Sequence, residues 1–300
     1  MRVTLTSLLL AAGLSLPGAA GWAADPCADH VPQPRPQNAS RDIVGQEMDV
    51  LQEQGHMLFA VYEDYPPYSW EKGGKPHGVD VEIARLIAED LGVEARFNFV
   101  AAGENLDADL RNNIWRGPIV GGRVANVMMR VPYDSAFKCR VEQVVFTGQY
   151  ATESIAIAYD AASYPDEKPL PAYFRFDTVA VENDSISDFY LSALAGGQLS
   201  GQIRRFSTMQ EAMAALRAGE TKAAMGPLAE LEHGLSEGLE VHQPPLPGFA
   251  VGRWTLGVAV NFRYRPLSYA VDDAIRYGIQ DGRIPAIYAA YGLSYQPPEW

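Results

Sequence analysis

The chain contains two successive series of short apolar strands and amphipathic helices, and it crosses between them twice. The first series occupies residues 41–150 and the second residues 151–254, after which residues 255–300 lead back to the first. Alternating strands and helices form layered α/β units, and two crossings require two lobes joined by two strands. The sequence therefore predicts an α/β fold in which each lobe is a mixed sheet flanked by helices. Ligands of such sheets bind beyond the carboxyl ends of the strands, so we expect a cleft between the lobes.

Local patterns place the first elements. Apolar spacing predicts a helix over residues 41–54, a buried strand over 57–62, a strand over 95–100, a polar helix over 105–115 and a strand over 125–129. Between the first two strands, Asp80 is the expected N-cap of a helix that ends at Gly92. Gly73 and Gly74 indicate a turn.

The N-terminus is typical of a secretory signal peptide. Arg2 precedes an apolar stretch, and a run of small residues ends near Ala23 and Ala24. A membrane anchor is the alternative, but the apolar stretch is too short to span a bilayer. We expect residues 1–24 to be removed on export to the periplasm, leaving an extended, Pro-rich arm over residues 25–40 and no membrane span.

The chain has two cysteines, Cys27 and Cys139. Two thiols in an oxidising compartment tend to pair, so we expect a disulfide that tethers the arm to the first lobe, with two unpaired thiols as the alternative. The five histidines show no paired ligand spacing, and no metal site is expected.

Composition and motifs narrow the function. The formal net charge of −13 and the sequence pI near 4.8 argue against nucleic-acid and anionic-membrane partners. The sequence has no nucleophile elbow, no Walker loop and no dinucleotide fingerprint. We therefore expect neither catalytic residues nor a cofactor.

Several residues at strand ends are candidates for ligand binding. Asp64, Tyr65, Tyr68 and Trp70 follow the first strand, where rings could stack on a ligand and a carboxylate could accept from a cation. Arg130 follows the strand over 125–129 and could hold the carboxylate of a ligand, or it could form a salt bridge with a carboxylate of a lobe. In the second lobe, Asp184 and Ser185 precede a helix, where they could help to bind an anion or could simply cap that helix.

These segments resemble the periplasmic solute-binding proteins of family 3. The resemblance covers residues 41–292 and rests on Asp-Tyr-Pro-Pro-Tyr at 64–68, Gly-Val-Asp-Val-Glu at 78–82, Val-Ala-Val-Glu-Asn-Asp-Ser at 179–185, and the helix over 209–219. It implies the type II periplasmic-binding-protein fold and an extracytoplasmic protein that closes its lobes on a small polar solute. It also implies an ABC-type permease as partner.

Two departures from the family concern the ligand. The family's carboxylate-binding arginine falls near Arg140, whose surroundings lack the usual Thr-x-x-Arg context, and Pro227 stands where the family has an ammonium-binding aspartate. A bound ammonium without a carboxylate would be buried unpaired. Ordinary amino acids are therefore not the expected ligands.

Three further segments are similar to the J-type accessory proteins of quinoprotein, methanol-oxidising dehydrogenases, at residues 109–117, 127–134 and 226–229. That resemblance implies a non-transport accessory protein of a periplasmic dehydrogenase and cytochrome c system, with Trp115, Arg116 and Tyr133 as partner contacts. A dehydratase-type enzyme on the same fold is the third alternative.

Overall fold

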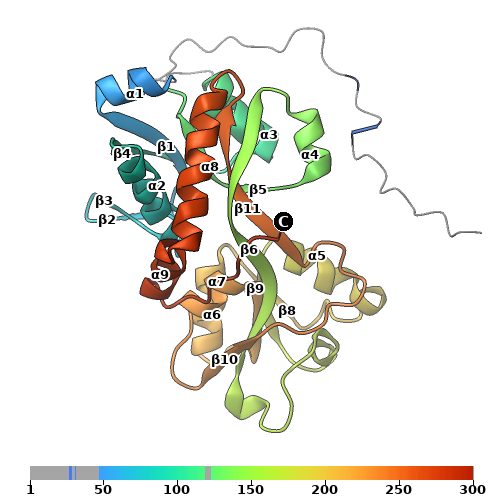
Figure 1. Cartoon of the computed structure of the whole chain (residues 1–300). Coiled ribbons are helices and arrows are strands. Elements are labelled where there is room, and N and C mark those ends of the chain that lie inside the picture. Colours follow the sequence, from blue (N-terminus) through green and yellow to red (C-terminus); the bar gives the residue numbers. More distant parts are fainter. Residues whose placement is uncertain (1–26, 29–30, 32–46, 119–122, 300) are drawn as a thin grey trace, which may run out of the picture.

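The computed structural model describes residues 27, 28, 31, 47–118 and 123–299. They form two lobes joined by two long strands, as the sequence predicts (Figure 1). The expected signal peptide, most of the arm and the start of the helix expected from residue 41 lie outside the described residues. The lobe boundaries at residues 150 and 254 stay a prediction.

Lobe 1 is built around a mixed sheet. Strand β1 pairs in parallel with β4 and with β5, and β5 pairs antiparallel with β11. The helices and strands of this lobe are α1 (Met48–Gln54), β1 (His56–Tyr62), β2 (Trp70–Lys72), β3 (Lys75–His77), α2 (Val79–Asp90), β4 (Glu94–Val100), α3 (Leu106–Leu110), a π-helical turn (Arg111–Trp115), β5 (Val127–Pro132), α4 (Ser135–Arg140), α8 (Arg265–Gln280) and α9 (Arg283–Ala290).

Lobe 2 repeats the plan on a smaller scale. Strand β7 pairs in parallel with β8 and β9, while β9 and β10 pair antiparallel with β6. Its elements are the 3₁₀ turns Ala161–Ser163 and Pro171–Arg175, β7 (Val179–Glu182), α5 (Ile186–Ala193), the 3₁₀ turn Leu194–Gly197, β8 (Ile203–Phe206), α6 (Met209–Arg217), β9 (Ala223–Pro227), α7 (Leu228–His233) and β10 (Leu239–His242).

Two strands connect the lobes. Strand β6 (Val144–Asp160) and strand β11 (Arg253–Asn261) pair antiparallel where both cross. Because β6 belongs to both sheets, the strand order β4-β1-β5-β11-β6-β9-β7-β8 is continuous. The 17-residue β6 accounts for the long β-branched run in the sequence.

Each sheet has a core on both faces. In β1, Phe59 and Val61 belong to one buried cluster and Ala60 to another, and in β7 Val181 and Ala180 divide in the same way. Successive side chains of a strand point to opposite faces, so each lobe is a sheet between two apolar layers.

Two irregularities, where β5 and β6 pair with β11, position the site. Between its pairs Met128–Ala259 and Val131–Gly257, strand β5 has two residues where β11 has one. Strand β6 has three residues opposite Gly257, where a Cβ would lie 2.8 Å from the carbonyl oxygen of Thr147. Such bulges bend a strand and redirect its side chains.

Local differences from the sequence predictions have physical reasons. Asp80 is not the N-cap of α2, because the helix begins at Val79 and Asp80 is buried inside it. The polar helix expected over 105–115 continues into a π-helical turn, and the sequence interpretation missed the short α4, β10 and the β2–β3 hairpin. Gly73 and Gly74 form the hairpin turn, both with positive φ, as predicted.

The expected disulfide is confirmed. Cys27 and Cys139 are bonded, with their Cα atoms 5.5 Å apart and 112 residues between them in sequence. The bridge attaches residue 27 to α4. Within residues 47–118 and 123–299, no helix combines the length and the apolar character that crossing a membrane requires.

Candidate functional site

A cavity of about 840 Å³ lies where the two lobes meet the crossing strands. Lobe 1 contributes Tyr62, Tyr65 and Arg130, lobe 2 contributes Ile186, and β11 contributes Trp254. Its volume is in the range that small-molecule sites occupy. Charged residues also line it, namely Asp109, Asp134, Arg253 and Glu299.

Arg130 is the central cation of this site and is 7 % exposed. Its Nη2 donates to Glu153 Oε2 at 3.1 Å, and its Nη1 lies 3.8 Å from Asp80 Oδ2. The guanidinium carbon lies 3.0 Å from the ring centroid of Tyr68. Both carboxylates are more than nine-tenths buried, so the arginine already has two buried counter-ions.

The backbone places Arg130 among these groups. It sits in the β5 bulge with φ 58°, a left-handed conformation that is unfavourable for a residue with a Cβ. Such a conformation costs on the order of 1–3 kcal/mol and persists only where the surroundings require it. The two carboxylates and the Tyr68 ring supply that requirement.

Tyrosine hydroxyls complete the network. Tyr68 donates to Glu153 at 2.6 Å and Tyr150 donates to Asp80 at 2.8 Å. Burial raises the pKa of both tyrosines well above the ordinary value, so they act as neutral donors. Burial also raises the pKa of Asp80, although Arg130 and the Tyr150 hydrogen bond act to lower it.

A hydrogen bond from Tyr65, which lines the cavity, joins the two lobes directly. The Tyr65 hydroxyl of lobe 1 donates to Glu230 Oε1 of α7 at 3.1 Å. Burial, with the negative charge of Glu182 nearby, raises the pKa of Glu230 to about 8. Glu230 is therefore mainly protonated at pH 7.

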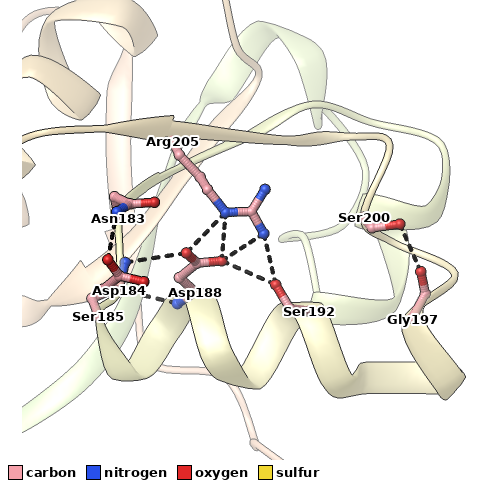
Figure 2. A network of polar contacts seen from close by, with 8 residues as sticks. All are labelled: Asn183, Asp184, Ser185, Asp188, Ser192, Gly197, Ser200 and Arg205. Atoms are coloured by element: carbon pink, nitrogen blue, oxygen red, sulfur yellow. Dashed lines mark hydrogen bonds and ion pairs between the residues drawn. The ribbon is translucent and has the colours of Figure 1, made fainter.

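The start of α5 in lobe 2 is also bound internally (Figure 2). Ser185 Oγ accepts from the backbone N–H of Asp188, and Asp188 Oδ2 accepts from the backbone N–H of Asp184. Arg205 Nε donates to both carboxylate oxygens of Asp188, and Ser192 donates to Oδ1. Burial alone would raise the pKa of Asp188, but the hydrogen bonds from Arg205 and Ser192 leave it lowered. The N-cap of α5 is thus the Ser185 hydroxyl, and the Asp188 carboxylate binds the backbone N–H of Asp184, just before the helix.

The structure brings some of the predicted site residues together and separates others. Tyr65, Arg130 and Tyr133 line the cavity, and Tyr68 lies directly behind Arg130. Asp64 is exposed and does not line it. Trp70 packs between His77 and His233, with ring centroids 5.9 and 6.0 Å away.

The other predicted residues lie outside the cavity lining. Arg140 is exposed at the end of α4, near the ring of Phe137, and Pro227 ends β9. Asp184 and Ser185 belong to the α5 cap. Trp115 is buried in lobe 1 and Arg116 is exposed beside it. Ligand or partner binding by any of these residues stays a prediction.

The residues that sequence reasoning missed include Asp80, Glu153, Glu230 and Trp254. Glu153 had a usable signal, because a carboxylate inside a long apolar strand needs a buried partner. Asp80 resembled an N-cap residue in the sequence, and only the folded structure brings Asp80 and Glu153 close to Arg130. In the described part of the chain, no three His, Cys, Asp or Glu side chains gather as metal ligands would.

The two lobes and the two strands that join them have the type II periplasmic-binding-protein fold. Residues 57–114 match the family model for bacterial extracellular solute-binding proteins, family 3. The matched segment runs from β1 into the π-helical turn and so includes Tyr65, Tyr68 and Asp80. No curated protein sequence matches the chain.

Solved structures of this fold align with most of the chain. An ancestral cationic amino acid solute-binding protein (AncCDT-1) is 19 % identical, with a TM-score of 0.66 over 82 % of this chain and 99 % of its own. An amino acid ABC transporter substrate-binding protein from Streptococcus pneumoniae, bound to L-arginine, is 20 % identical, with a TM-score of 0.57 over 83 % and 98 %. A mutant of ArgBP from T. maritima is 20 % identical, with a TM-score of 0.54 over 81 % and 98 %. At these identities the likeness shows the fold.

Proposed function

We propose that this protein is an extracytoplasmic solute-binding protein whose two lobes close on a small polar ligand. The observation that supports this role best is the cavity of about 840 Å³, which both lobes and a crossing strand line together. A ligand there would touch both lobes at once, so binding would favour the closed arrangement. The Tyr65–Glu230 hydrogen bond is a contact that closure forms and opening breaks.

The proposal includes where the protein acts and with what. The signal peptide directs it to the periplasm, and an ABC-type permease receives the solute from the closed form. The ligand is not an ordinary amino acid, because Pro227 replaces the expected aspartate and Glu230, the nearest carboxyl group of lobe 2 to Tyr65, is mainly protonated at pH 7. We propose a binding role without catalysis.

Lobe closure can be tested by distance measurement. A thermal-shift screen of alcohols, amides, organic acids and amino acids first identifies a ligand. Spin labels at Glu53 of lobe 1 and Glu220 of lobe 2, both exposed, should move closer together when that ligand binds. A ligand at 100 times its Kd should stabilise the protein by about 2.7 kcal/mol. Labels at Glu53 and Glu89, both in lobe 1, are the matched control. An unchanged Glu53–Glu220 distance at saturation contradicts the proposal.

A second candidate function, the accessory role beside a periplasmic dehydrogenase, is favoured by one surface. Ile186, Phe189 and Val251 are 40, 60 and 53 % exposed, and they line an apolar groove of about 490 Å³ that shares Ile186 and Val251 with the cavity. Large exposed apolar side chains mark protein contacts. Pull-down from native periplasm with wild type and a Phe189→Ser variant tests this role, and equal recovery of partners contradicts it.

A further inference from the structure

The boundary between the lobes at helix α7 contains a buried carboxyl group. Tyr65 of lobe 1 donates to Glu230 Oε1 at 3.1 Å, and Glu230 is only 8 % exposed. Pro66 of lobe 1 and Glu230 and His233 of α7 line a separate cavity of about 360 Å³ at this boundary. We call these four residues the α7 seam. Since lobe 1 supplies part of the cover over Glu230, the burial of this carboxyl group depends on contact between the lobes.

Other contacts of α7 with lobe 1 lie beside the seam. The ring centroids of Trp70 and His233 are 6.0 Å apart. The backbone N–H of Ser294, in the segment after α9, donates to Glu232 Oε2 at 2.8 Å. Opening of the lobes at α7 breaks these contacts together with the Tyr65–Glu230 hydrogen bond, and it exposes Glu230 to water.

Negative charges face Glu230 from two strands. Burial raises the pKa of Glu230 to about 8, and the negative charges of Glu182 on β7 and Glu153 on β6 add to this effect. Arg130 acts in the opposite direction, but it is already bound to Glu153. In the seam Glu230 therefore keeps a proton at neutral pH that a carboxyl group in water loses.

No cation is paired with Glu230 among the residues that the structure describes. Tyr65 and Tyr68 face it as neutral hydroxyls, because burial raises the pKa of each well above the ordinary value. Arg217 of α6 lines the seam cavity, is exposed, and donates to the backbone carbonyl at the end of α7 at 2.7 Å. Partial burial lowers the pKa of His233, so its ring is uncharged at neutral pH. Protonation is therefore what neutralises Glu230 in the seam.

We infer that closure of the two lobes is coupled to the uptake of a proton by Glu230, so that alkaline solution favours the open form. This inference rests on the proposed binding function and adds the proton as a second ligand of the closed form. In the open form Glu230 faces water and is ionised at neutral pH, whereas in the closed form it is protonated. A ligand that binds one of two states more tightly shifts the equilibrium towards that state. Lower pH therefore favours closure, and higher pH opposes it.

The probe for this coupling is pH alone, applied to the ligand-free protein. Spin labels at Glu53 and Glu220 measure the populations of the closed and open forms. The closed-to-open ratio should fall at least tenfold between about pH 6 and about pH 9, because one coupled proton changes the ratio by up to about tenfold for each pH unit. Equal distance distributions at the two pH values overturn the inference.

Two variants of α7 assign the effect to one carboxyl group. Glu230→Gln keeps an oxygen for the Tyr65 hydroxyl and cannot ionise, so its closed-to-open ratio should be the same at both pH values. Glu232→Gln is the matched control on the same helix: Glu232 also contacts lobe 1 but is less buried, and glutamine keeps an acceptor for Ser294. It should show the pH dependence of the wild type. A pH dependence that persists in Glu230→Gln, or that disappears in Glu232→Gln, overturns the inference.

A third variant tests the contact itself. Tyr65→Phe removes the hydroxyl and leaves Glu230 in place, so it should lower the closed-to-open ratio at about pH 6, where the hydrogen bond is intact in the wild type. An unchanged ratio overturns the inference, because closure would then not depend on the seam. This arm is also informative if Glu230→Gln fails to fold by circular dichroism.

Failure of this inference differs from failure of the proposed function. A Glu53–Glu220 distance that shortens at ligand saturation but does not respond to pH contradicts the proton coupling and leaves the binding function standing. A distance that responds to pH but to no ligand has the opposite meaning.

Discussion

Two of the arginine–carboxylate clusters among the described residues differ in burial. Arg130, Asp80 and Glu153 have side-chain exposures of 7, 1 and 5 %, whereas Arg205 is 38 % exposed beside the buried Asp188. A partly exposed pair is screened by solvent and contributes little, while breaking a buried one leaves an uncompensated charge. The lobe 2 cluster lies in the first turn of α5, and the Arg130 cluster borders the cavity.

The largest expected effect comes from removing the buried arginine. Arg130→Leu should lower the free energy of unfolding by about 3–5 kcal/mol, because Asp80 and Glu153 lose their cation in a buried site. Urea denaturation at pH 7 measures this change. A decrease in the free energy of unfolding below about 1 kcal/mol would show that the buried Arg130 cluster contributes no more than the partly exposed Arg205–Asp188 pair, which contradicts the comparison.

Glu230 extends the comparison, because it is a buried carboxyl group without a paired cation. Its pKa of about 8 lies above that of the unfolded chain, so the folded state keeps a proton that the unfolded state loses. The stability contribution of Glu230 should therefore be full below about pH 4.5, fall as pH rises towards 8, and level off above that.

Glu230→Gln should remove this pH dependence. At pH 8.5 the variant should be more stable than wild type by about 1–3 kcal/mol, with no gain at pH 4.5. Thermal or urea unfolding at the two pH values measures the difference. An equal change in stability at both pH values would show that the substitution does not act through the raised pKa of Glu230.

The cap of α5 gives a smaller effect. Ser185→Ala should cost about 1 kcal/mol, since the backbone N–H of Asp188 loses its acceptor. Ser185→Asn is the matched control and should stay near wild type, because asparagine caps equally well. Urea midpoints of the two variants decide between a capping role and a merely packed serine.

The smallest effect is expected at the exposed arginine. Arg205→Gln should cost at most about 1 kcal/mol, and less at high salt. The pH dependence of stability due to Asp188 should be opposite in sign to that due to Glu230, because the pKa of Asp188 is lowered in the folded state. The contribution of Asp188 to stability is present at neutral pH and is lost as pH falls through its folded-state pKa. Denaturation of wild type and variant at two salt concentrations and across acidic pH tests both points.

The fold was more predictable than the site. Apolar periodicity located β1, β4 and β5 within a few residues and identified the two crossings, because each element buries a patterned face. The short α4 and β10 have too few residues to show a period. The bulge at Arg130 leaves no sequence signal, since β-bulges arise from strand pairing.

The candidate site was predictable only as a set of residue types. The sequence identified Tyr65, Tyr68 and Arg130 as candidates, and it left two partners open for Arg130, a carboxylate of the ligand or a carboxylate of a lobe. The structure shows pairing within the protein, with Asp80 of α2 and Glu153 of the crossing strand β6, which are 50 and 23 residues away in sequence. Such long-range pairing depends on topology and not on local pattern.

The central claim is that the cleft's buried arginine is already satisfied by the chain's own carboxylates. Calorimetric titration of the mature protein with L-arginine and L-glutamine at pH 7 tests this claim most directly, because each carries a carboxylate that would compete for Arg130. We expect no saturable binding below the millimolar range. A micromolar Kd for either amino acid would contradict the account.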